Sequence, residues 1–87
     1  MAQPVKMSMT EIVGRITNYL FSVAERNRLE WPVQKAEMHR DLQEQAITEI
    51  PQGCFDAAIL DLKQRDIVEE RQGHCWLNAE VFRRMVR

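Results

Sequence analysis

Hydrophobic residues recur every three to four positions in four segments of the chain, a spacing that predicts four amphipathic helices. The first segment follows Ser8, which together with Glu11 has the spacing of a capping box, so we expect a helix from this point to about Arg26. Its apolar face consists of Ile12, Val13, Ile16, Leu20, Val23 and Ala24. Tyr19 and Phe21 widen the apolar surface beyond a single stripe.

Two more helices are predicted in the middle of the chain. Met38 and Leu42 are one helical turn apart, in a helix expected over residues 37–47. Pro51 marks the start of the third helix, because proline is tolerated in the first turn. The expected buried stripe of this third helix consists of Phe55, Ala58, Ile59 and Leu62.

Three short strands are predicted between and after these helices. Residues 29–33 alternate between apolar and other side chains, and Pro32 suits an edge strand because its nitrogen has no hydrogen to donate. Ile67 opens the second strand, and Gln72-Gly73 supplies a hairpin turn to a return strand over residues 74–77. The pattern therefore predicts a small antiparallel ribbon, or wing.

The chain ends in a fourth predicted helix, with Asn78 as its N-cap. Its apolar side consists of Val81, Phe82, Met85 and Val86. The length of 87 residues suits one domain, which we place at residues 8–87 after a flexible tail over residues 1–7. The first and last helices carry more apolar surface than one small core needs, so we expect a homodimer that forms through them.

The predicted fold is mainly α with a small antiparallel β-wing, in the order helix, strand, helix, helix, strand, strand, helix. Residues 37–42 read E-M-H-R-D-L and look like the second-helix pattern E-L-A-x-x-L. Residues 62–68 look like the pattern L-x-x-x-G-L-I at the entry to a wing, with Asp66 in place of glycine, where aspartate accepts a positive φ. The order and these two segments resemble the winged-helix superfamily over residues 8–87.

This resemblance implies a DNA-binding protein of transcription regulation that inserts its third helix into double-stranded DNA. Its groove-reading positions would be Gln52, Gly53, Asp56, Ala57 and Leu60. Arginine and glutamine at the wing tip and basic residues near the second helix would add contacts. The candidate nucleic-acid residues are Gln52, Arg71, Gln72, Lys35, Arg40 and Arg28.

The charge pattern favours a second interpretation. The net charge is −1, but residues 41–66 carry two basic and six acidic side chains, so the third helix lies in the most acidic part of the chain. Phosphate contacts supply much of the affinity for DNA, and an acidic helix opposes them. The alternative is therefore a protein-interaction or adaptor module in which Ala57, Leu60 and Trp76 contact another protein.

Little in the sequence indicates catalysis. The glycines are isolated and form no phosphate-binding loop, and the serines lack a nearby His–Asp pattern, so we predict no enzyme and no cofactor. The spacing of His39, Cys54, His74 and Cys75 matches no zinc module. We expect a cytoplasmic protein without a membrane segment and with two reduced thiols. The sequence alone does not exclude a Cys54–Cys75 disulfide, because the two residues could lie close together in space.

Overall fold

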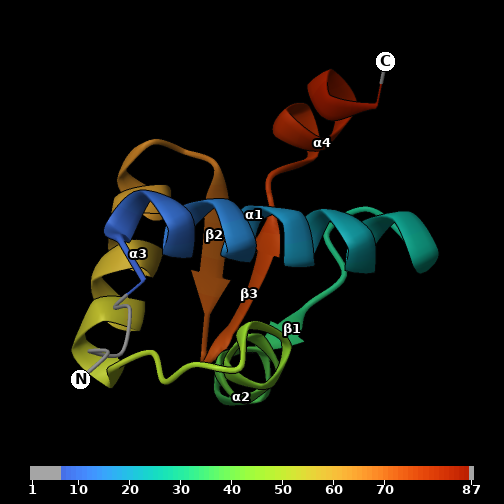
Figure 1. The fold of residues 1–87 in the computed structure, drawn as a ribbon. Helices are drawn as coiled ribbons and strands as arrows, with labels where there is room; N and C mark the ends of the chain where they lie inside the picture. Colours follow the sequence, from blue (N-terminus) through green and yellow to red (C-terminus); the bar gives the residue numbers. More distant parts are fainter. Residues whose placement is uncertain (1–6, 87) are drawn as a thin grey trace, which may run out of the picture.

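The computed structural model describes residues 7–86, so the predicted tail, apart from Met7, lies outside the described residues. The elements are α1 (Met9–Arg26), β1 (Val33–Gln34), α2 (Lys35–Ala46), α3 (Gln52–Gln64), β2 (Val68–Arg71), β3 (His74–Leu77) and α4 (Ala79–Met85). The predicted class and the predicted order are confirmed. In Figure 1, α1 crosses the sheet, α3 lies beside β2, α2 lies on one side of α1 and α4 on the other.

The three strands form one antiparallel sheet in the order β1-β3-β2. Val33 of β1 and Glu70 of β2 are both paired with Cys75 of the central strand β3. The turn between β2 and β3 has positive φ at Gln72 (50°) and at Gly73 (79°). A two-residue hairpin turn of this handedness matches the twist of its strands, which confirms the turn predicted at this position.

The core lies between the sheet and the first three helices. The helical stripes predicted from spacing supply most of it, because each turns one face inward. The buried cluster consists of Ile12, Ile16, Leu20, Val33, Met38, Leu42, Ile50, Phe55, Ala58, Ile59, Leu62, Val68, Cys75 and Leu77. Val13 and Val23, which were predicted on the apolar face of α1, pack at the edge of this cluster.

The helix ends follow their capping residues. Ser8 Oγ accepts a hydrogen bond from the Glu11 amide at 3.2 Å, which confirms the predicted N-cap of α1. Helix α2 begins at Lys35, two residues earlier than predicted. It ends at Ala46 because Ile47 takes a left-handed conformation with φ of 53°. Side chains with a branched Cβ rarely adopt this conformation, and Ile47 is 91% exposed.

The extent predicted for the first strand was wrong. The strand covers only Val33–Gln34, whereas Leu29 and Glu30 form a turn in which Glu30 has φ of 59°. A positive φ reverses the chain, so the alternation of side chains before Pro32 does not reflect a strand. Asp66, which stands where the resembling pattern has glycine, takes a positive φ of 58° where α3 leads into β2.

Helices α1 and α2 are joined by a hydrogen bond from Tyr19 Oη to Asp41 Oδ2 at 2.8 Å. Burial, followed by the hydrogen bond with Asp41, raises the pKa of Tyr19 to about 12, so the phenol keeps its proton as a donor at neutral pH. Between residues 7 and 86, no helix is both long enough and apolar enough to cross a membrane.

Candidate interaction surface on α3 and the wing

Three of the predicted nucleic-acid residues come together around one hollow. Lys35 at the start of α2, Gln52 at the start of α3 and Gln72 at the wing turn all line a hollow of about 350 Å³. They come from three elements that the hairpin turn and the α2–α3 connection bring side by side. The amide of Lys35 donates to the Gly73 carbonyl at 3.0 Å and thereby holds the wing turn against α2.

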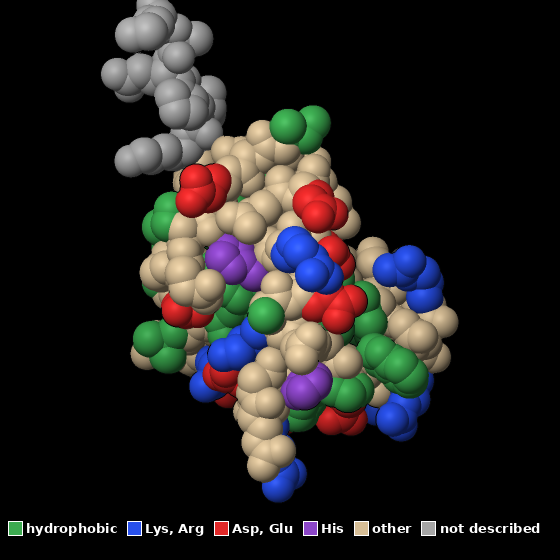
Figure 2. Space-filling model, turned by 90° about the horizontal axis from the view of Figure 1, so that it is seen from below, with side chains coloured by type: hydrophobic (Ala, Val, Ile, Leu, Met, Phe, Trp, Pro, Cys, Tyr) green, Lys and Arg blue, Asp and Glu red, His purple; other side chains and the backbone are tan. Residues whose placement is uncertain are grey.

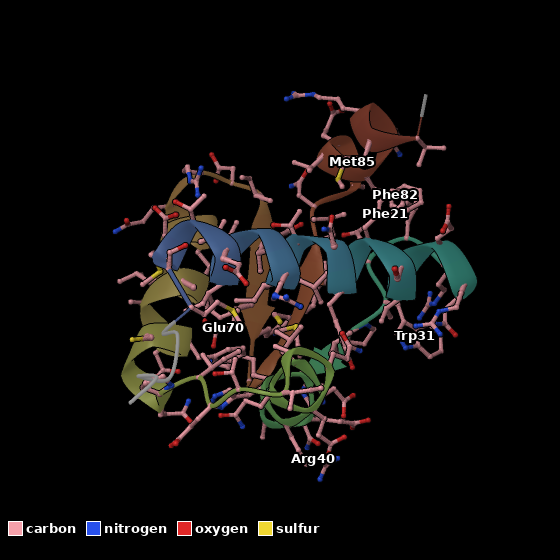
Figure 3. All side chains as sticks on the ribbon, in the orientation of Figure 1. Phe21, Trp31, Arg40, Glu70, Phe82 and Met85 are labelled. Atoms are coloured by element: carbon pink, nitrogen blue, oxygen red, sulfur yellow. The ribbon has the colours of Figure 1, made fainter. Side chains whose placement is uncertain are left out.

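Glu70 controls the charge beside this hollow. Lys35 Nζ donates to Glu70 Oε2, and Lys63 Nζ donates to Glu70 Oε1 at 2.8 Å. The hydrogen bonds from Lys35 and then from Lys63 hold the pKa of the Glu70 carboxyl below its ordinary value. Figure 3 labels Glu70 between α3 and α2. Glu70 thus offsets one of the two lysine charges, and both ammonium groups are held in ion pairs within the chain.

The outward side of α3 is acidic and apolar. Gln52 Nε2 donates to Asp56 Oδ1 at 2.9 Å, so the one predicted base-reading side chain of the helix is bound to its own neighbour. Ala57 is exposed, and Leu60 is 53% exposed. A second hollow of about 270 Å³ lies between Leu60 and the Lys63–Glu70 pair. We call Gln52, Asp56, Ala57, Leu60 and Lys63, with Lys35, Glu70 and Gln72, the α3–wing surface.

The three predicted arginines do not line these hollows. Arg71 is exposed on β2 beside the wing turn, and Arg40 is exposed on α2. Arg28 lies over the ring of Trp31 at 5.4 Å, near the end of α1. Figure 3 shows Arg40 and Trp31 pointing away from the body at separate places. On the face seen in Figure 2, basic and acidic side chains are interspersed and form no continuous basic stripe.

Trp76 does not join the α3–wing surface. It pairs with Glu69, and side chains alternate along a strand, so both lie on the opposite sheet face from Glu70 and Cys75. Trp76 is half-buried, and its indole N–H is buried without a hydrogen-bond acceptor among residues 7–86. Of the residues predicted to contact a protein, only Ala57 and Leu60 are therefore exposed on one surface.

The sequence reasoning missed the role of Glu70. Glu69 and Glu70 are adjacent acids on β2, and nothing in the sequence analysis distinguished them. The hairpin register separates them, because the residue opposite Cys75 must face the core side of the sheet. Counting back from the Gln72-Gly73 turn identifies Glu70 as that residue. His74, which also lines the hollow beside Gln72, was missed as well.

The two cysteines do not form a disulfide. Both thiols are free, with Cys54 half-buried and Cys75 buried. Burial raises the pKa of Cys75 to about 12, so this thiol stays protonated and unreactive at neutral pH. Across residues 7–86, no three His, Cys, Asp or Glu side chains are grouped as metal ligands. Comparisons of the chain with protein-family models, curated proteins and solved structures find no match.

Proposed function

We propose that this chain is a winged-helix protein whose α3–wing surface binds another protein. The order of elements and the β1-β3-β2 sheet support the winged-helix assignment. One observation carries the functional proposal: Glu70 holds Lys35 of α2 and Lys63 of α3, while Leu60 beside them is exposed. The surface thus offers an apolar side chain and paired charges where a DNA-binding helix needs free cations.

The same residues indicate the chemistry of the partner. Leu60 and Ala57 give α3 an exposed apolar strip, and Asp56 lies beside it. Interfaces of this kind place an apolar anchor at the centre and polar groups around it, where charges improve specificity. We infer a partner that offers an apolar recess for Leu60 with basic groups near Asp56.

Site-specific photo-crosslinking in the cells that produce the protein tests this proposal. A benzophenone side chain replaces Leu60 or Ala57, and as a control it replaces Ser22, which is exposed on α1. We expect one protein to crosslink at positions 60 and 57 and not at position 22. An Asp56→Lys substitution in the same chain should weaken that crosslink. Equal crosslinking at all three positions would contradict the proposal.

DNA binding through the wing is the second candidate. Arg71 is exposed beside the turn and makes no ion pair within residues 7–86, and the exposed Gln72 adjoins it. These side chains are suited to phosphate contacts. Titration of a random DNA duplex at low and at moderate salt separates the candidates. Binding that weakens with salt and is lost in Arg71→Ala would favour DNA, and no binding at low salt would exclude it.

A further inference from the structure

Helix α4 is incompletely covered by its own chain. It has seven residues, Ala79–Met85, and none of them is buried. The Asn78 side chain accepts hydrogen bonds from the amides of Glu80 at 2.9 Å and Val81 at 3.4 Å. An isolated helix shorter than about 12 residues is marginal in water even with a cap. Helix α4 therefore depends on packing, and the packing present in one chain covers only part of it.

Val81 and Phe82 pack against the edge of the core, and Phe82 does so through a contact with α1. The rings of Phe21 and Phe82 are 5.1 Å apart between centroids and are tilted by 32°. Met85 and Val86 follow Phe82 on the same side of α4 and are 39% and 51% exposed. Figure 3 shows Phe21, Phe82 and Met85 gathered where α4 meets α1. An apolar strip thus continues from this contact into solvent.

Helix α1 extends the strip through a glycine that one chain does not explain. Gly14, Thr17 and Phe21 share one face of α1, because they are spaced by three and four residues. Glycine inside a helix costs about 1 kcal/mol relative to alanine. Among residues 7–86, a Cβ at Gly14 would meet nothing within 4 Å, so no contact with these residues requires glycine there. A close approach by another molecule would require it.

We propose that a second copy of this chain packs on this surface, which we call the α1–α4 surface (Gly14, Thr17, Phe21, Phe82, Met85 and Val86). The charges of α4 favour a copy of itself. Glu80 lies at the start of the helix, and Arg83 and Arg84 lie at its end. Two antiparallel α4 helices related by a two-fold axis would place each glutamate opposite the arginines of the other copy.

The ion pairs within α4 are weak enough to be exchanged for ion pairs between two copies. Glu80 is 3.8 Å from Arg83 and 4.0 Å from Arg84, and all three side chains are at least 64% exposed. Such ion pairs contribute little to stability in solvent and can be exchanged. A stable dimer needs roughly 800 Å² from each partner, more than one short helix offers. The face of α1 around Gly14 must therefore form part of the interface.

Sedimentation equilibrium of the full chain over a concentration series tests the dimer. We expect twice the chain mass at micromolar concentration and above. Gly14→Lys and Met85→Glu should each raise the dissociation constant roughly tenfold or more, because each would bury an unpaired charge. Gly14→Lys is the sharper variant. Its side chain enters open space in one chain, so far-UV circular dichroism and folding should be unaffected.

Gln45→Lys is the matched control, because Gln45 is exposed on α2, which lies on the opposite side of α1 from α4. It adds the same charge and should leave the dissociation constant unchanged. A chain that stays monomeric at the highest concentration reached would overturn the proposal. The proposal would be overturned as well if the Gly14→Lys variant dimerised with the wild-type dissociation constant. The α3–wing proposal does not depend on either result.

Discussion

Helices α3 and α4 lie in very different surroundings, although they lead into and out of the same wing. Helix α3 buries Phe55, Ala58, Ile59 and Leu62, and its Asp61 and Lys63 form ion pairs within the chain. Helix α4 buries no residue between Ala79 and Met85 and leaves Met85 exposed. Helix α3 is therefore anchored in the core, whereas α4 lies outside it and has an exposed apolar side chain, Met85.

The largest test of this contrast removes one phenylalanine from each helix. Phe55 is 1% exposed, and its ring lies 4.5 Å from that of His39, so Phe55→Ala should cost about 3–5 kcal/mol of unfolding free energy. Phe82 is half-buried, and Phe82→Ala should cost about 1–2 kcal/mol. Urea unfolding at low protein concentration measures both. Equal losses would mean that α4 is as integral to the monomer as α3.

A smaller test removes a helix cap. Asn78→Ala deletes the side-chain oxygen that caps α4 and should cost about 1 kcal/mol. Because α4 contributes little to the core, the loss should be local. Hydrogen exchange should accelerate at the amides of α4 and remain unchanged in α3. Ser8→Ala is the matched control, because it removes the cap of α1. Helix α1 is part of the core, so a similar loss of stability should accelerate hydrogen exchange throughout the domain.

Local sequence signals were enough to predict most of the fold. Spacing identified the buried stripe of α3, and the caps Ser8 and Asn78 located the starts of α1 and α4. The Gln72-Gly73 turn followed from the glycine, whose φ can be positive without strain. These features depend on a few neighbouring residues, which is why one sequence reveals them.

Features that depend on tertiary packing were not predicted. Glu30 adopts a positive φ although this residue type does not favour it, so the start of β1 was misplaced. Glu70 meets two lysines that are 7 and 35 positions away, one on α3 and one on α2. No local pattern contains that information. The candidate site was therefore predicted as a set of residues and not as a charge arrangement.

The smallest expected effect on stability comes from Glu70→Gln, which tests the ion pairs of the α3–wing surface. The substitution keeps the volume and removes the charge, so Lys35 and Lys63 lose their partner. We expect a loss of less than about 1 kcal/mol at pH 7, because these ion pairs are partly exposed. The released lysines should raise affinity for random duplex DNA at low salt by roughly a few-fold, with a steeper salt dependence.

The pH dependence of Glu70→Gln identifies the cause. The pKa of Glu70 is lowered in the folded chain, so its contribution to stability is present above the unfolded pKa and is lost as pH falls through the folded pKa. The difference in unfolding free energy between wild type and Glu70→Gln should therefore shrink below about pH 4.5 and then disappear.

Glu69→Gln, on the other face of β2, is the matched control and should change neither DNA affinity nor acid stability. If wild type binds DNA as tightly as Glu70→Gln, the ion pairs do not suppress phosphate contacts. The protein-binding proposal would then lose its main support.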